Sequence, residues 1–286
     1  MNTCKQDRGG FTLIELLVVI SLIAVLAALT MAFLPNAASS AREARAAVQL
    51  QGWLNVAKQR ALRDQAPRGL RLWRSAANLD QVVECQYLEQ PDDFSGGTVK
   101  ALVGATNTVI FTGVDLSNGD TTGDKKFWSV QPGDYLEVMG TGLIHYIVDV
   151  TKSTVLIKPP LPYPVAETKN YRIARSPRAV GDETLKMPDG TIIDLLTNTA
   201  YSNALPPSDP NSGIGFVDIL FGPSGAVISR GVATANIHLW VRAPDPNNPT
   251  DVYRGDPTII SVYVRTGLVD AYPPAPPPGD PYRLVR

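Results

Sequence analysis

The sequence has little of the side chains that most often perform chemistry or cross-link an exported domain. Its 286 residues include 2 histidines and 2 cysteines. His145 and His238 each lie in an alternating segment beside large apolar residues, which predicts structural histidines rather than metal ligands or catalytic bases. Cys85 lies in a strand-like run and is expected to be a small buried side chain, with a reactive thiol as the alternative.

A large net charge and known catalytic motifs are lacking as well. The chain has 26 Lys and Arg against 27 Asp and Glu, so its net charge is -1, and it has no basic excess for binding nucleic acid. It contains no Gly-x-Ser-x-Gly nucleophile elbow. Gly213-Ile214-Gly215 lacks the strand and helix that flank a dinucleotide-binding loop. The sequence therefore predicts a protein that is not an enzyme and that needs no cofactor.

What the sequence does have is a long apolar run with one charged residue. Between residues 11 and 34 only Glu15 is ionisable. At about 1.5 Å per helical residue, this run is long enough to cross a hydrocarbon core of about 30 Å. An isolated carboxylate in lipid costs on the order of 2.5 kcal/mol or more. Glu15 is therefore expected to have a partner.

The residues just before the run distinguish two kinds of targeting signal. Basic residues precede it, as they do in a secretory signal peptide or an unprocessed anchor. A signal peptide, however, has a shorter apolar core followed by small residues, and here the small residues come first. The string Gly10-Phe11-Thr12-Leu13-Ile14-Glu15 resembles the class III signal of type IV pilins and type II secretion pseudopilins.

This resemblance implies how the chain is processed and assembled. Prepilin peptidase would cleave between Gly10 and Phe11, remove Cys4 with the leader, and methylate the new amino terminus. Glu15 would pair with the terminal amine of a neighbouring subunit, since two buried charges are tolerated only when each neutralises the other. The implied partners are prepilin peptidase, other pilin-like subunits and a membrane assembly platform.

The implied location is the bacterial inner membrane, crossed once. Counting basic residues does not orient the segment, because the leader and the residues just beyond the apolar run each carry a net charge of +1. The resemblance places the leader in the cytoplasm and the C-terminal domain outside it. After assembly, the subunit would reside in a filament.

After Pro35 the apolar pattern becomes periodic, which predicts an amphipathic continuation of the same helix, kinked at Pro35 and ended by Pro67 and Gly69. Its buried face is expected to consist of five residues at alternating three- and four-residue spacing. They are Ala47, Leu50, Leu54, Ala57 and Ala61.

The rest of the chain predicts an antiparallel β domain, and the fold class is therefore α+β. Short β-branched or aromatic segments alternate with turn residues. They are residues 70–73, 81–88, 108–112, 135–139, 143–150, 154–157, 191–195, 216–221, 235–241 and 258–264. A further turn is expected at 187–191. The segments 215–225 and 260–267 resemble the closing strands and glycine turns of H-type minor pseudopilins.

The predicted organisation has five parts and one insertion. Residues at about 98–175 interrupt the domain and are typical of a β meander or small barrel, which would serve either as a partner surface or as structural elaboration. The parts are a leader at 1–10, a transmembrane half-helix at 11–34, an amphipathic half-helix at 35–66, the β domain at 67–270 and a proline-rich tail at 271–286. The tail is expected to be extended, polyproline-like and mobile.

One loop has the composition of a weak cation site. Asp115, Asn118, Asp120 and Asp124 supply the hard oxygen ligands that calcium accepts. Their spacing does not fit the twelve-residue calcium loop, and solvated turns commonly have this composition. A calcium site here is the lesser alternative.

Together the two resemblances imply a minor pseudopilin of H type that assembles into a filament for type II secretion. Two alternatives stay open. The first is a minor pilin of a type IV pilus or of a DNA-uptake pseudopilus, because the leader is common to these machines. The second is a membrane-anchored surface protein whose β domain binds or hydrolyses a ligand.

Overall fold

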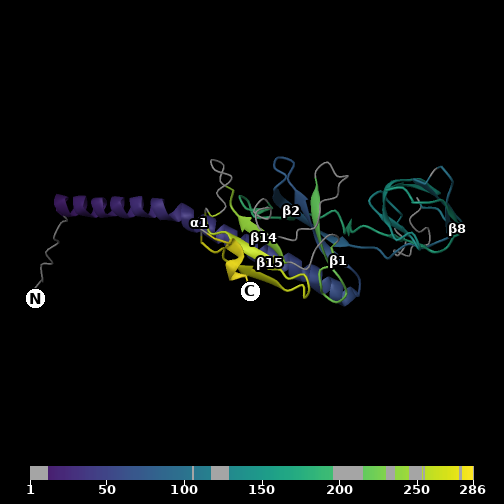
Figure 1. Ribbon diagram of the computed structural model, residues 1–286. Coiled ribbons are helices and arrows are strands. Elements are labelled where there is room, and N and C mark those ends of the chain that lie inside the picture. The colour runs from purple at the N-terminus through teal and green to yellow at the C-terminus, as the bar shows by residue number, and fades with distance from the viewer. Residues whose placement is uncertain are drawn as a thin grey trace, which may run out of the picture.

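A long helix, α1 (Leu13–Asp64), leads into two β structures that lie side by side (Figure 1). The structure, a computed structural model, describes residues 12–104, 106–116, 129–195, 215–229, 236–244, 253, 255–276 and 279–285, without side chains for 29–39. Every pairing between its named strands is antiparallel. The predicted α+β class with an antiparallel sheet domain is confirmed.

Helix α1 has 52 residues and continues through Pro35. It ends at Asp64, slightly before the predicted end, because Gln65 takes the left-handed conformation (φ 49°) that stops a helix. The five residues predicted for its buried face are all buried. They pack against the sheet, so the three- and four-residue spacing identified the correct face.

The first β structure is the host sheet, which α1 covers on one face. Along the sheet the strand order is β13-β1-β2-β12-β14-β15-β16, and β10 and β11 also pair with β2. Its strands are β1 (Arg68–Arg74), β2 (Gln81–Glu89), β10 (Arg178–Ala179), β11 (Leu185–Lys186), β12 (Ile192–Asp194), β13 (Phe216–Phe221), β14 (Ile237–Arg242), β15 (Thr258–Val262) and β16 (Val269–Tyr272).

Tight turns connect host strands where the sequence predicted them. Gly190 (φ 77°) precedes β12, and the Thr191 amide donates to the Pro188 carbonyl at 3.0 Å. Gly225 (φ 82°) follows β13, and its amide donates to the Gly222 carbonyl at 2.8 Å. Positive φ favours glycine at both positions.

The proline-rich tail differs from the prediction, because its described part is docked rather than mobile. Ala275 and Pro281 are buried. The Ala275 amide donates to the Pro281 carbonyl at 2.9 Å, and residues Pro281–Leu284 form a short 3-10 helix, η2. Tyr282 stacks on His238 with ring centroids 4.3 Å apart. Residues 271 and 272 of the predicted tail belong to strand β16 (Val269–Tyr272). Beyond them, Pro281 is buried and Tyr282 packs on His238, whose side chain lies on the face of β14 away from α1.

The second β structure is the inserted module, which lies beyond the end of the host sheet near the C-terminus of α1 (Figure 1). Its strand order is β8-β3-β4-β7-β6-β5-β9, and it has a separate apolar core. Its strands are β3 (Thr98–Ala101), β4 (Thr108–Thr112), β5 (Tyr135–Val138), β6 (Ile144–Val150), β7 (Thr154–Lys158), β8 (Val165–Thr168) and β9 (Tyr171–Ala174).

The chain leaves and re-enters the host sheet at neighbouring points. Glu89, the last residue of β2, is the antiparallel partner of Arg178, the first residue of β10. Polar contacts fix this junction: Arg178 forms a buried ion pair with Asp134 of the module at 3.2 Å, and the Gln90 side chain donates to the Arg175 carbonyl at 2.8 Å. Burial raises the pKa of Asp134, although backbone amides and Arg178 oppose that rise.

Candidate functional site

At the amino-terminal end of α1, the acidic residue of the first turn, Glu15, takes part in a local hydrogen-bond network. Thr12 is the N-cap residue, and its hydroxyl accepts a hydrogen bond from the Glu15 amide at 3.3 Å. Oε2 of Glu15 accepts from the Thr12 amide at 3.0 Å and from the Thr12 hydroxyl at 2.9 Å. This reciprocal arrangement is a capping box, in which a carboxylate satisfies donors that the helix leaves free.

Thr12 was missed as a site residue, although the sequence contains its signal. A Thr-x-x-Glu spacing directly before an apolar run is the pattern of a capping box. Gly10 and Phe11, the predicted processing residues, lie outside the described residues.

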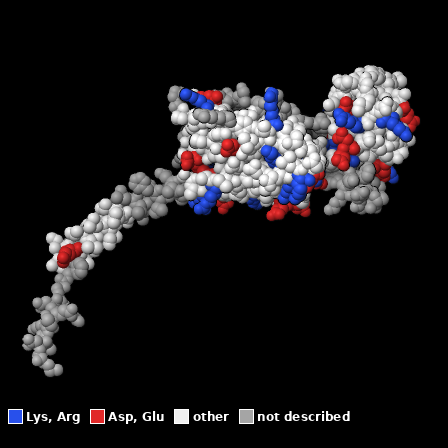
Figure 2. All heavy atoms as spheres, turned by 90° about the horizontal axis from the view of Figure 1, so that it is seen from below, with Lys and Arg blue, Asp and Glu red and all other residues white. Residues whose placement is uncertain are grey.

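The apolar half of α1 has its large side chains exposed, at between 44 % and 81 % of their surface. Figure 2 shows this arm of the molecule, extending away from both β structures. Over the residues that the structure describes, no helix combines the length and the apolar composition needed to span a membrane. The exposed side chains are Leu13, Ile14, Leu16, Leu17, Val18, Val19, Ile20, Leu22, Ile23, Val25 and Leu26.

A buried carboxylate joins α1 to the host domain at the end nearest this arm. Oε2 of Glu43 accepts a hydrogen bond from the Asp256 amide at 2.6 Å, and the Ser40 hydroxyl donates to Asp256 at 3.0 Å. Gly255 has φ +84°, and a Cβ there would lie 2.6 Å from Oε1 of Glu43. The sequence offers no signal for this contact, because the partners are far apart in the chain.

The structure brings together little of the predicted cation loop. Asp115 forms an ion pair with Lys152 at 3.4 Å. Asn118, Asp120 and Asp124 lie outside the described residues. Within the described ranges, no three His, Cys, Asp or Glu side chains are grouped so that they could hold a metal ion.

The two histidines and Cys85 are buried, and each has a structural environment. Nδ1 of His145 donates to the Pro159 carbonyl at 2.7 Å, and Nδ1 of His238 lies 2.8 Å from the Ser261 hydroxyl. Burial lowers the pKa of His238 to about 4, although Asp280 opposes the change. Burial raises the pKa of the Cys85 thiol, with a smaller contribution from Glu84, so the unreactive thiol form predominates.

Comparison with known proteins adds information about the amino-terminal end alone. Residues 5–31 match the prokaryotic N-terminal methylation motif. Comparisons with curated proteins and with solved structures gave no match. The matched residues include the capping box at Thr12 and Glu15 and all of the exposed apolar side chains from Leu13 to Leu26. The motif supports a type IV pilin-like protein that is processed by prepilin peptidase and assembles with other pilins.

Proposed function

We propose that this chain is a minor pseudopilin that assembles into an inner-membrane-anchored filament for type II secretion. The observation that carries the proposal is the methylation motif at residues 5–31 at the start of α1. The packing of α1 on an antiparallel sheet supports it, because one helix then serves both as an anchor and as part of the domain core. The turns at Gly225 and Gly267, which lie in the two segments that resemble H-type pseudopilins, have the positive φ that favours glycine.

Assembly rather than catalysis is the proposed mechanism. Cleavage between Gly10 and Phe11 frees an amine, which methylation leaves basic. In lipid, the capping box with Thr12 stabilises the Glu15 carboxylate until a neighbouring subunit arrives. Both hydrogen bonds from Thr12 end on Oε2, and a carboxylate has a second oxygen that can accept from another donor. The amine of the neighbour would then neutralise Glu15.

The exposed apolar residues of α1 require an apolar environment both before and after assembly. In the membrane they contact lipid, and in the filament they contact the helices of other subunits. Both environments remove these side chains from water, at about 25 cal/mol for each Å² buried. The subunit can therefore move from membrane to filament without exposing its apolar face.

The natural amino terminus tests the processing step. Mass spectrometry of the protein isolated from its own cells should find a methylated Phe11. An intact Met1 on the mature protein would contradict processing and with it the filament role.

The Glu15 side chain tests the assembly step. Glu15→Ala and Glu15→Leu should leave membrane insertion intact and should reduce incorporation into isolated filaments at least tenfold. Ser21→Ala is a matched control, because the Ser21 hydroxyl donates only to the Leu17 carbonyl of the same helix. Normal incorporation of both Glu15 variants would refute the pairing.

A type IV pilus or a DNA-uptake pseudopilus would use the same amino-terminal segment. Deletion of the gene separates the machines: exported proteins should accumulate inside the deletion strain. Loss of surface pili or of DNA uptake, with normal export, would assign the subunit to one of the other machines.

A further inference from the structure

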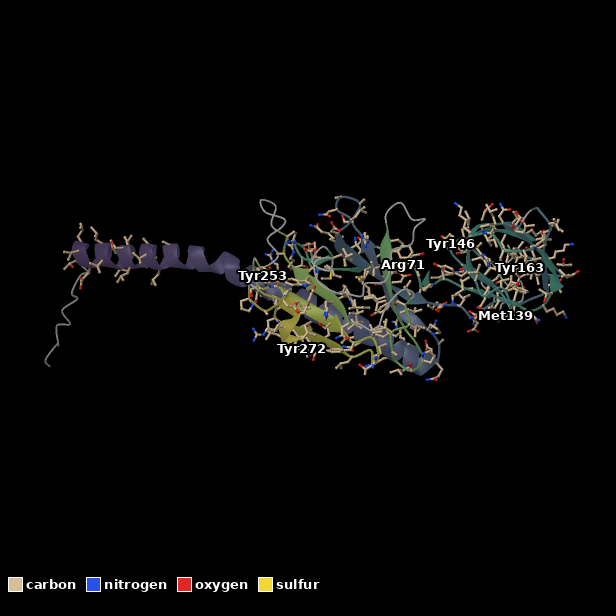
Figure 3. All side chains as sticks on the ribbon, in the orientation of Figure 1. Arg71, Met139, Tyr146, Tyr163, Tyr253 and Tyr272 are labelled. Atoms are coloured by element: carbon tan, nitrogen blue, oxygen red, sulfur yellow. The ribbon has the colours of Figure 1, made fainter. Side chains whose placement is uncertain are left out.

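One end of the inserted module has an unusual concentration of exposed apolar side chains. The loops after β3, β5 and β7 all lie at the end of the module's strands opposite the junction with the host sheet, as the antiparallel pairings require. We call this surface the apolar cap. Its exposed members are Leu102, Val103, Met139, Leu143, Ile144 and Tyr163, and Figure 3 labels Met139 and Tyr163 on the module.

The three loops of the apolar cap are fastened to one another. The Leu161 amide donates to the Thr106 carbonyl at 2.9 Å, and the Tyr163 hydroxyl donates to the Gly140 carbonyl at 3.0 Å. Beneath them, His145 donates to the Pro159 carbonyl. These hydrogen bonds connect the described parts of the three loops, and a surface that is held together before binding loses less conformational entropy when it binds.

Charge is nearly absent from these loops. Residues 102–107, 139–143 and 158–164 include one charged side chain, Lys158. Surface loops are normally polar, and solvent-exposed apolar side chains gathered at one place mark an interaction site. The apolar cap is thus a candidate binding surface rather than an ordinary set of turns.

Beside the apolar cap, charges of both signs lie next to each other. Ile144 is the strand partner of Glu137, and Glu137 is the partner of Arg172 on the next strand. Arg172 and Glu137 form an ion pair at 2.7 Å. Figure 2 shows blue and red side chains side by side on the flank of the module. An anionic lipid surface attracts an excess of basic residues, whereas an uncharged centre with a mixed polar rim is typical of a protein interface.

The shape of the cap limits the partner further. Val103 keeps 86 % of its surface exposed, so it protrudes instead of lining a hollow. A second copy of the same cap would also protrude, and two protruding surfaces bury little area against each other. A recess in another protein can enclose Val103 and Tyr163 together.

We propose that the apolar cap docks into an uncharged, apolar recess of a different folded protein. Met139 and Tyr163 belong to the residue types that are enriched at protein interfaces, and central aromatic side chains commonly carry much of the binding energy. This role goes beyond the filament function and does not depend on Glu15 or on processing.

Photo-crosslinking in the cells that naturally make the protein tests this docking. The full chain carries p-benzoylphenylalanine in place of Val103, of Tyr163, or of Lys152 as a control. Lys152 is 77 % exposed but lies in the β6–β7 turn, at the opposite end of the module. Positions 103 and 163 should crosslink to the same protein, and position 152 should not.

Once the crosslinked partner is identified, it can be purified without the crosslink and its affinity for the full chain measured directly. Val103→Asp should weaken its binding to the full chain at least tenfold and should leave the unfolding midpoint and filament incorporation unchanged. Equal crosslinking from position 152, products containing only a second copy, or an affinity unchanged by Val103→Asp would overturn the proposal. So would Val103-dependent flotation with vesicles of phosphatidylethanolamine and phosphatidylglycerol.

Discussion

Two buried polar side chains of strand β14 in the host sheet, His238 and Arg242, contribute to its stability in different ways. His238 is neutral when folded because burial lowers its pKa to about 4, from an ordinary value of 6.5. Arg242 is charged and paired: its guanidinium contacts Asp194 at 2.6 Å, and both side chains are 2 % exposed. One site is therefore sensitive to pH, and the other is sensitive to loss of its partner.

For His238, we expect stability to fall as the solution is acidified. Between pH 6.5 and about 4 the unfolded chain binds a proton that the folded chain does not, so the free energy of unfolding decreases across that window and is fully retained above it. Urea unfolding of the detergent-solubilised protein at pH 7.5, 6, 5 and 4.5 measures the decrease. His238→Gln should show a smaller decrease, and equal pH dependence in both proteins would contradict this account.

For the ion pair, removal of one partner should cost more than removal of both. Arg242→Met leaves Asp194 buried without its ion partner, and we expect a loss of about 3–5 kcal/mol in the free energy of unfolding. The double variant Asp194→Leu with Arg242→Met should recover most of that loss, because no unpaired charge remains. Urea midpoints of the two variants provide the measurement. A double variant less stable than Arg242→Met would show that the pair acts in another way.

Gly52 of α1 and Gly69 of β1 allow a comparison of the same substitution in two environments, one open and one tightly packed. A Cβ at Gly69 would lie 2.3 Å from the Ile219 carbonyl oxygen of β13, whereas a Cβ at Gly52 would have no atom within 4 Å apart from its chain neighbours and the backbone of its own helix. Gly69→Ala should destabilise the fold by about 1–3 kcal/mol by forcing β1 and β13 apart. Gly52→Ala should stabilise it by about 0.5–1 kcal/mol, since alanine favours a helix.

Thermal unfolding monitored by circular dichroism checks both glycine variants. If the two variants shift the midpoint in the same direction, the local environments do not explain the difference. A stable Gly52→Ala protein that fails to enter filaments would further show that this exposed face of α1 packs closely against a neighbour.

The sequence predicted individual elements better than it predicted their partners. The bounds of β4 and β13 agree with the apolar alternation of residues 108–112 and 216–221. Strands β3, β8 and β16 were missed, since each has only four residues and two of them, an alanine and a charged residue, have low β propensity. The pairing of β1 with β13 could not be predicted, because strand order depends on contacts between distant segments.

For the candidate site, too, the sequence predicted features with a local pattern and missed contacts between distant segments. Glu15 stands out in the sequence because one carboxylate interrupts an apolar run, and the periodicity of α1 indicated its buried face. The contact of Glu43 with the Asp256 amide and the packing of Tyr282 on His238 have no local pattern. Both join segments brought together only by folding.

The two β structures have separate cores, so the molecule should tolerate removal of the inserted module. Glu89 and Arg178 are opposite each other in an antiparallel pair, and an Asn-Gly turn can join two such strands. A chain in which Asn-Gly replaces residues 90–177 should keep the host fold, with Arg68 still bonded to Glu89. Its filament incorporation should be unchanged, and the crosslinked partner of the cap should no longer bind.

Circular dichroism and filament isolation measure these outcomes for the shortened chain. A shortened chain that is unfolded would show that the host depends on the module, for example through the hydrogen bond from Arg71 to the Pro177 carbonyl. A folded chain that still binds the partner would place the binding surface outside the apolar cap.

The neighbouring exit and entry points at Glu89 and Arg178 also bear on how the protein evolves. Because the host strands need no rearrangement, a single genetic event can introduce, exchange or delete the whole module. Related chains are therefore expected to share α1 and the host strands while differing most in length between these two positions. The part of the protein that selects a partner could then diversify while the polymerising part is inherited intact.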